Sequence, residues 1–469
     1  MSPLRQSQTI HTPRQAQCTR REALAGLSAA AVGPWALRLL ADEQRPNILL
    51  ISLDTLRASH LGMFGYERDT SPRLDDFAAE AALFARAYSP SSWTCPSHAS
   101  VLTGVYPPAH QIESTTARLA DGWPTLARLL KLAGYSTKAI VSGPMVDSAH
   151  GFDQGFDDFD DRTYVEHTDF GSIASEPDAE KQKKMREEIL LYSVRAADVV
   201  RKEAERWLLE QAAEPWFLFL HFWDIHADYI PPPPYDEAFD SGYQGPITGR
   251  IKSEAVHAGM APRDLQRFVA LYDGEIGWTD YQVGRLLDSM REWGLESRTL
   301  VAMFSDHGEE FFEHGTKGHA HNLHDTLIHV PLLFRWPERW PGGARFDTPV
   351  SLVDLAPTLL DAARVPVPEW MQGRSLTGAL SGKADLPVKT LFGDLFFRGN
   401  EQHYLLDGYI KLINDNKTRT QAIYNLLSDP EERRNLAAQM PDLARLHLQR
   451  LGEWWAESEA ARERLLGNG

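Results

Sequence analysis

Cysteine, positive charge and long apolar runs are all scarce in this 469-residue sequence. It has two cysteines, Cys18 and Cys95, which excludes a disulfide framework and a cysteine-based zinc finger. Lysine and arginine number 48 against 65 aspartates and glutamates, a net charge of −17 without a basic stripe, so no nucleic-acid partner is expected. Residues 46–469 contain no apolar run of about 20, so we expect no membrane span there.

The remaining composition is that of a globular protein, with 43% hydrophobic and 24% charged residues. The first 45 residues differ from the rest. Arg20-Arg21 precedes a short apolar run, Ala23–Gly33, which Pro34 follows. This order resembles a twin-arginine export signal, so we expect export to the periplasm or the cell exterior, with cleavage near Ala41. An amphipathic N-terminal helix is the alternative.

Buried strands and amphipathic helices alternate from residue 46 onward. Continuous apolar runs predict strands buried on both faces of a sheet, in Asn47–Leu53, Ala139–Val141, Trp216–Leu220, Leu300–Phe304 and Val330–Phe334. Helical periodicity occurs in Leu74–Ala82, Leu126–Leu132, Ile189–Leu208 and Leu265–Leu287. The alternation predicts an α/β fold with a large, mostly parallel sheet and helices on both faces.

The pattern changes near residue 390. Short antiparallel strands are predicted at Thr390–Phe397, Tyr404–Ile413 and Gln421–Leu426, and a charged helix follows from about Asp442. We therefore expect a catalytic α/β domain at 46–385 and a smaller C-terminal subdomain with an antiparallel sheet at 386–469.

Residues of metal-ligand type follow several predicted strands. Asp54 ends the first strand, His221 ends another, and Asp306-His307 ends a third. Ligands bind at the carboxyl ends of strands in such sheets, so these side chains should meet at one edge. Six of the 17 histidines lie between His307 and His329, among several glutamates, a density that predicts a divalent metal site. A solvated polar loop is the alternative.

A second candidate site lies in the segment Ser92–Gly104. Pro96 suits the first turn of a helix, which would put Thr94 at the helix N-terminus. The dipole and free N–H groups there favour an anion and help to ionise a hydroxyl. Taken alone, Thr94 is equally consistent with a helix cap.

These segments together resemble the sulfatase family. Leu102-Thr103-Gly104 matches the end of the family's nucleophile signature and puts Thr94 at the nucleophile position. The other landmarks follow in family order: Asn47–Arg57, Ser305–Glu309, Val350–Leu360, Gln372–Leu376 and Tyr424–Leu436. The resemblance covers about residues 46–440 and implies a hydrolase of sulfuric esters.

The nucleophile segment departs from the family pattern. Sulfatases use a cysteine or serine that is oxidised to formylglycine, whereas this chain has Thr94, with Cys95 one position late and His98 in place of an arginine. Formylglycine is therefore not expected. Thr55 replaces the second aspartate of the metal strand. With a threonine at the nucleophile position, the chain is similar to the branches of the alkaline-phosphatase-like superfamily that use a threonine nucleophile. These branches include phosphodiesterases and phosphoethanolamine transferases.

The resemblance also implies a metal-ligand set. Asp54, Asp306 and His307 would bind a divalent metal, and Thr94 would complete the site as the nucleophile. The mixture of carboxylate and imidazole favours Zn²⁺ or Mn²⁺, with Ca²⁺ or Mg²⁺ as alternatives.

Further histidines are assigned from the same resemblance. His221 and His226, with His319 13 residues after Asp306, match the spacing of three histidines in the transferases, although His221 is equally consistent with a buried histidine at a strand end. His226 and His319 are expected to hold the non-bridging oxygens or to help bind a second metal. His98 or His321 would protonate the leaving group. The expected substrate is a small-molecule or glycan ester of sulfuric or phosphoric acid. The alternatives are a phosphodiesterase, a phosphoethanolamine-type transferase, and a catalytically inactive binding protein on a sulfatase fold.

Overall fold

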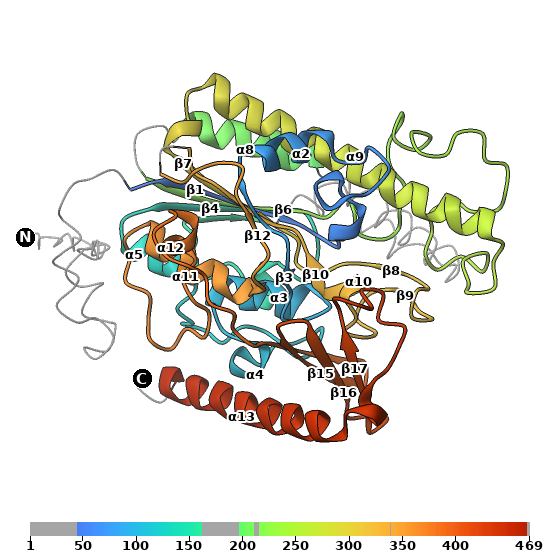
Figure 1. Cartoon of the computed structure of the whole chain (residues 1–469). Coiled ribbons are helices and arrows are strands. Elements are labelled where there is room, and N and C mark those ends of the chain that lie inside the picture. Colours follow the sequence, from blue (N-terminus) through green and yellow to red (C-terminus); the bar gives the residue numbers. More distant parts are fainter. Residues whose placement is uncertain (1–44, 162–196, 211–214, 338, 467–469) are drawn as a thin grey trace, which may run out of the picture.

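The computed structural model describes residues 45–161, 197–210, 215–337 and 339–466. The predicted export signal and the first part of the predicted helix Ile189–Leu208 lie outside the described residues. None of the described helices has the length and apolar character that crossing a bilayer requires. Figure 1 shows one large sheet between two layers of helices, with a smaller sheet and the long helix α13 below it.

The large sheet has eight strands in the order β12-β2-β11-β7-β1-β6-β4-β5. The bounds of these strands are β1 Asn47–Leu53, β2 Ala82–Phe84, β4 Ser136–Val141, β5 Asp158–Asp160, β6 Trp216–Phe222, β7 Thr299–Phe304, β11 Leu332–Arg335 and β12 Arg345–Phe346. β1 pairs in parallel with β6 and with β7, so the apolar runs predicted as buried strands form the centre of the sheet. The predicted α/β fold with a mostly parallel sheet is confirmed.

Alternate side chains of β1 enter two separate hydrophobic cores. Ile48 and Leu50 pack with α3, α5 and α11, whereas Leu49 and Ile51 pack with α2, α8 and α9. The helices therefore cover both faces of the sheet (Figure 1). Their bounds are α2 Pro72–Ala79, α3 Thr94–Thr103, α4 Pro107–His110, α5 Leu126–Leu132, α8 Ala197–Glu210, α9 Pro262–Glu292, α10 Asp325–Ile328, α11 Leu355–Ala362, α12 Thr377–Leu380 and α13 Pro441–Leu466.

The apolar run Val330–Phe334 is not the single strand that was predicted. Pro331 has no N–H to donate to a ladder, and the chain divides there. The residues before it form β10, which pairs with β3 in a three-stranded sheet, and those after it form β11, which runs antiparallel to β7. The smaller strands are β3 Ala87–Tyr88, β8 Glu310–Phe311, β9 Lys317–Gly318, β10 His329–Val330 and β13 Val350–Ser351. The predicted helix Leu74–Ala82 also ends earlier, at Ala79, because Ala82 begins β2.

The C-terminal part contains the predicted antiparallel sheet, in the order β14-β15-β16-β17. The predicted strand Tyr404–Ile413 is in fact two strands, since Asp407 pairs with Ile410 across a two-residue turn. Gly408 has a φ of 61° there, a left-handed conformation that glycine adopts without strain. The bounds are β14 Leu391–Phe397, β15 Asn400–Asp407, β16 Ile410–Asp415 and β17 Thr420–Asn425. The domain boundary at residue 385 stays a prediction.

A buried lysine ties this sheet to the histidine-rich segment. The Lys411 side chain is 0% exposed, and its Nζ donates to Asp325 Oδ1 at 2.7 Å and forms an ion pair with Glu432 Oε1 at 2.8 Å. The Asp325 backbone N–H donates to the other Glu432 oxygen at 2.6 Å. We call these three residues the Lys411 triad. Because α10 begins at Asp325, the triad fastens the chain just after the predicted site histidines.

The neighbouring His324 predicts loss of stability in acid. Its ring stacks on His314 at 3.6 Å, and its Nε2 lies 3.4 Å from Tyr424 Oη. Burial, His314 and Lys411 lower the pKa of His324 from 6.5 to about 2. The unfolded chain therefore binds a proton below pH 6.5 that the folded chain does not bind. Stability is full above that pH and should fall below it, by roughly 1 kcal/mol per pH unit.

Urea unfolding near neutral pH and at about pH 5 measures this dependence. His324→Asn keeps a polar group beside Tyr424 but cannot titrate in this range, so its decline should be shallower than that of the wild type. Equal slopes for the two proteins would contradict the assignment.

Candidate active site

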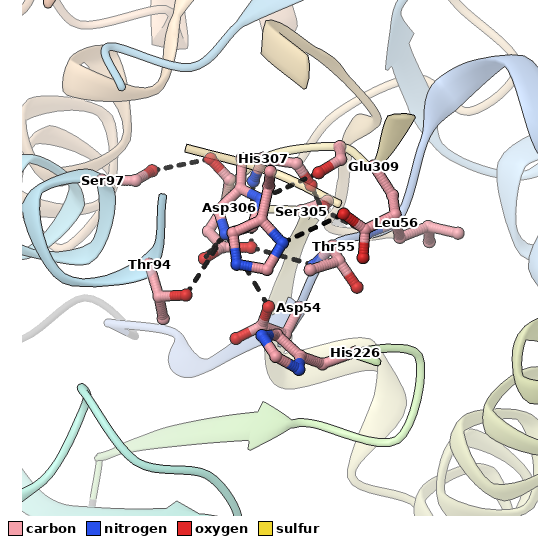
Figure 2. A network of polar contacts seen from close by, with 12 residues as sticks. Asp54, Thr55, Leu56, Thr94, Ser97, His226, Ser305, Asp306, His307 and Glu309 are labelled. Atoms are coloured by element: carbon pink, nitrogen blue, oxygen red, sulfur yellow. Dashed lines mark hydrogen bonds and ion pairs between the residues drawn. The ribbon is translucent and has the colours of Figure 1, made fainter. Parts of the chain in front are cut away.

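The carboxyl ends of β1 and β7 place two aspartates side by side. The strands are adjacent and parallel, Asp54 follows one and Asp306 follows the other, and both side chains are fully buried. One ligand-type atom from each of Asp54, Asp306 and His307 lies within 4.8 Å of the other two (Figure 2). The structure thus brings together the three residues that were predicted as metal ligands.

The free atoms in this group fit a divalent cation. Asp54 Oδ1 and Asp306 Oδ2 are buried without a hydrogen-bond partner. The other Asp306 oxygen accepts from the backbone N–H groups of Thr55 at 3.2 Å and His307 at 2.9 Å. His307 Nδ1–H donates to the Gly308 carbonyl at 2.9 Å, which leaves Nε2 with a lone pair. Two unsatisfied carboxylate oxygens and one imidazole nitrogen form a donor set that Zn²⁺ or Mn²⁺ accepts.

Three acidic side chains share this buried space. Burial and the carboxylates of Asp306 and Glu309 raise the pKa of Asp54 well above 3.8, and burial also raises the pKa of Asp306. Among the described residues, the side-chain contacts of Asp54, Asp306 and His307 include no lysine or arginine. A bound cation would balance these carboxylates.

Two neighbours fix the orientation of the predicted ligands. His221 Nε2 lies 3.0 Å from Asp54 Oδ2, and burial lowers the pKa of His221, so a neutral ring donates to that oxygen and holds the carboxylate. A Cβ at Gly308 would lie 2.2 Å from the Thr326 carbonyl oxygen, so only glycine permits this close approach. His221 thus holds the Asp54 carboxylate in place, and Gly308 allows the chain after His307 to lie against Thr326.

Thr94 begins α3 and its hydroxyl lies next to the predicted metal ligands (Figure 2). Its Oγ1 is 3.2 Å from His307 Nε2, and its side chain makes no helix-capping bond because Trp93 holds the cap position. The hydroxyl thus lies at the positive end of a buried helix dipole, where an ionised oxygen is stabilised. This position suits a nucleophile better than the alternative of a helix cap.

Cys95 has the properties of a structural cysteine. It is 0% exposed and lies in the hydrophobic core beneath α3, and burial raises the pKa of its thiol far above 9.0. A neutral, inaccessible thiol is chemically inert.

The structure gives His98 a different place from the one that a leaving-group acid needs. It is fully buried, its Nδ1–H donates to the Thr94 carbonyl at 2.9 Å, and its Nε2 accepts from Ser52 Oγ at 2.8 Å. Burial lowers the pKa of its ring. We therefore correct the expectation for His98: both ring nitrogens are occupied, and the ring supports Thr94 from behind instead of facing a leaving group.

His226 and His319 are half-buried, unlike the fully buried Asp54, Asp306 and His307. The ring centroids of His226 and His319 are 4.8 Å apart, and the ring centroids of His319 and His307 are 4.5 Å apart. His226 stacks on Trp223 at 3.8 Å, and its Nδ1–H donates to the Ala227 carbonyl at 2.7 Å.

His321, two residues beyond His319, is exposed to solvent. Of the two histidines expected to protonate a leaving group, His321 is therefore the accessible one.

Glu309 was missed as a site residue, although it lies two positions after His307 in the predicted metal motif. It is fully buried, and its Oε1 is 3.0 Å from His319 Nδ1. Burial lowers the pKa of His319. The Glu309 carboxylate and its hydrogen bond raise this pKa by more than burial lowers it, so the net pKa lies above 6.5. The Tyr229 hydroxyl donates to the second Glu309 oxygen at 2.7 Å. Nothing in the sequence pattern pointed to Tyr229.

Thr55 occupies the position of the second aspartate of the metal strand. It has a φ of 56°, which is unusual for a β-branched residue, and the Tyr272 hydroxyl donates to its carbonyl at 2.7 Å. Such backbone strain persists where the surroundings impose it, often at functional sites. Here it directs the Thr55 N–H at Asp306 and leaves Thr55 Oγ1 buried without a partner.

Asp306→Asn is expected to remove the bound metal. The change takes away one of two unsatisfied anionic oxygens, while the hydrogen bonds to the other oxygen can persist. Elemental analysis of the purified, dialysed protein measures the metal content, with the exposed Asp385→Asn as the matched control. A full metal complement in Asp306→Asn would remove Asp306 from the ligand set.

The fold as a whole is shared with hydrolases of phosphonate esters. The structure superimposes on the crystal structure of the phosphonate monoester hydrolase of Agrobacterium radiobacter with a TM-score of 0.72 and 21% sequence identity, covering 88% of this chain and 96% of that chain. At this identity the likeness defines the fold alone.

The sequence match is more specific. Residues 46–365 match the sulfatase family, and residues 313–451 match the C-terminal region of N-sulphoglucosamine sulphohydrolase. The chain belongs to the sulfatase family of ester hydrolases. It is 25% identical over 435 residues to a sulfatase of Formosa agariphila, with 83% of each chain covered. It is 27% identical over 377 residues to a choline-sulfatase of Rhizobium meliloti, with 72% of each covered.

Proposed function

We propose that this protein hydrolyses singly charged esters of sulfuric or phosphoric acid through a covalent ester on Thr94. The observation that carries the proposal is the Thr94 hydroxyl, 3.2 Å from His307 Nε2 and beside two buried carboxylate oxygens without partners. This is the arrangement of an activated nucleophile next to a cation site.

The residues around Thr94 supply the remaining parts of the reaction. A divalent metal held by Asp54, Asp306 and His307, with Zn²⁺ or Mn²⁺ favoured, would lower the pKa of the hydroxyl and polarise the ester. Thr94 gives its proton to solvent, its Oγ1 attacks sulfur or phosphorus in line, and the bond to the leaving-group oxygen breaks. His319 donates to a non-bridging oxygen, and the exposed His321 gives a proton to the leaving group.

Water then cleaves the covalent ester and restores the Thr94 hydroxyl. Because His226 Nδ1–H is engaged with the Ala227 carbonyl, its Nε2 carries a lone pair that can accept a hydrogen bond from this water.

The scarcity of cations argues for a substrate with one negative charge. The described contacts of Thr94 and the predicted metal ligands with other side chains involve histidines and carboxylates, and no lysine or arginine. A phosphate monoester dianion brings a second charge to a site that already holds three acidic side chains. A sulfate monoester, a phosphodiester or a phosphonate monoester brings one.

Nitrophenyl sulfate, nitrophenyl phosphate and a nitrophenyl phosphodiester, assayed side by side with metal-saturated protein, test this proposal. We expect turnover of the sulfate or the diester at least about tenfold faster than that of the phosphate monoester. A preference for the monoester would overturn the charge argument, and turnover of none of the three would favour an inactive binding protein.

The export signal is a separate proposal. We propose that residues 1–45 direct the folded protein out of the cytoplasm, on the strength of Arg20-Arg21 before a short apolar run. Fractionation of the producing cells tests it, and a full-length, uncleaved protein in the cytoplasmic fraction would overturn it.

A further inference from the structure

Glu309 and His319 face each other because of a small hairpin. Strands β8 and β9 are antiparallel, with Phe311 opposite Lys317 and Glu310 opposite Gly318. Continuing this register by one residue pairs Glu309 with His319, and the observed contact between Glu309 Oε1 and His319 Nδ1 is 3.0 Å. The hairpin begins directly after the predicted metal motif, so its register fixes the distance between His319 and His307.

The Glu309 carboxylate is itself held from behind. Its second oxygen accepts from the Tyr229 hydroxyl at 2.7 Å, and both side chains are fully buried. The Tyr229 ring packs among aromatic rings of the core, 5.0 Å from Phe268 and 5.4 Å from Tyr272. A buried tyrosine with neighbours of this kind has little freedom to move, so it fixes the carboxylate and the imidazole that follows.

We propose that Glu309 and Tyr229 are positioning residues that hold His319 through its Nδ1–H, so that its Nε2–H faces the ester oxygen. The inference rests on the proposed function, in which His319 contacts the ester. It assigns no metal to Glu309, because both of its oxygens already have partners, whereas the unsatisfied oxygens belong to Asp54 and Asp306. Outer partners of a metal-bound histidine are typically worth 10- to 100-fold in metal affinity or activity, and we expect an effect of that size on activity at His319.

A double-mutant cycle on Glu309 and His319 tests the proposal. Glu309→Ala should lower kcat by about 10- to 100-fold with little change in KM. Glu309→Gln should recover most of the loss, since its amide can accept from His319 and donate to Tyr229. In the His319→Ala background, Glu309→Ala should have no further effect beyond about twofold, because a residue that acts through His319 has nothing left to act on. Tyr229→Phe should give a smaller loss of kcat, and the exposed Glu254→Gln serves as the matched control.

Two further measurements separate the possible failures. Metal content should be unchanged in all Glu309 variants, and loss of metal from Glu309→Ala would make Glu309 a ligand and overturn the positioning role. Equal losses from Glu309→Ala with and without His319 would also overturn it. The ¹⁵N signals of labelled histidine report which His319 nitrogens carry protons and whether Nδ1–H is hydrogen-bonded, and the Nδ1 signal should change in Glu309→Ala. That readout needs no turnover, so it stands even if none of the esters is hydrolysed and the proposed function fails.

Discussion

Thr94→Ala is expected to lower kcat by roughly 10³-fold or more while leaving the fold intact. Removing the hydroxyl removes the atom that we propose forms the covalent ester. The fold should persist because the Thr94 side chain makes no capping bond, and the lost contact is the one to His307. Steady-state kinetics on the best of the three nitrophenyl esters, together with thermal unfolding, measure both effects.

Thr94→Ser is the matched variant for this experiment. It keeps the hydroxyl at the start of α3 and should retain a large part of the activity, with the same metal content as the wild type. Near-normal turnover in Thr94→Ala would show that Thr94 is not the nucleophile and that the alignment with the sulfatase signature is out of register.

Lys411→Met is expected to lower the free energy of unfolding by about 3–5 kcal/mol. The change removes the cation of the Lys411 triad and leaves the Asp325 and Glu432 carboxylates facing each other. Burial lowers the pKa of Lys411, but the two carboxylates raise it more, so the lysine stays charged in the native protein. For Glu432, burial raises the pKa more than Lys411 lowers it, and the net pKa is about 7.

Urea unfolding at neutral pH measures the loss of stability. The exposed Lys417→Met, from the turn after β16 in the same sheet, is the control and should change the free energy by less than about 0.5 kcal/mol. An unfolding midpoint for Lys411→Met within error of the control would show that the triad contributes no net stability.

The centre of the fold could be predicted because local pattern and long-range position agree there. The apolar runs at Asn47–Leu53 and Leu300–Phe304 are long enough to be buried strands, and they end in Asp54 and Asp306, so adjacent parallel strands bring the acids together. Two predicted strands were each wrong because the chain divides at one residue, Pro331 in the first and Gly408 in the second. Hydropathy alone reveals neither the missing N–H of Pro331 nor the left-handed turn at Gly408.

The supporting side chains of the site were harder to predict. Their roles depend on contacts between segments that are distant in sequence, such as Tyr229 with Glu309 and His98 with Ser52. The histidine content of the segment after His307 indicated a polar site, but only the register of β8 and β9 distinguishes His319, which faces His307, from the exposed His321. The burial of His98 could not be inferred from a motif in which an arginine is usual.

The buried Cys95 can report on motion of the helix that carries Thr94. It is the sole thiol in residues 46–469, and it neighbours Thr94 in the first turn of α3 with no exposed surface. A thiol reagent can reach Cys95 only when α3 separates from the core, so the labelling rate measures how often this local unfolding occurs. Slower labelling in the presence of a metal ion or a slowly hydrolysed ester would register ligand binding without any chromogenic substrate.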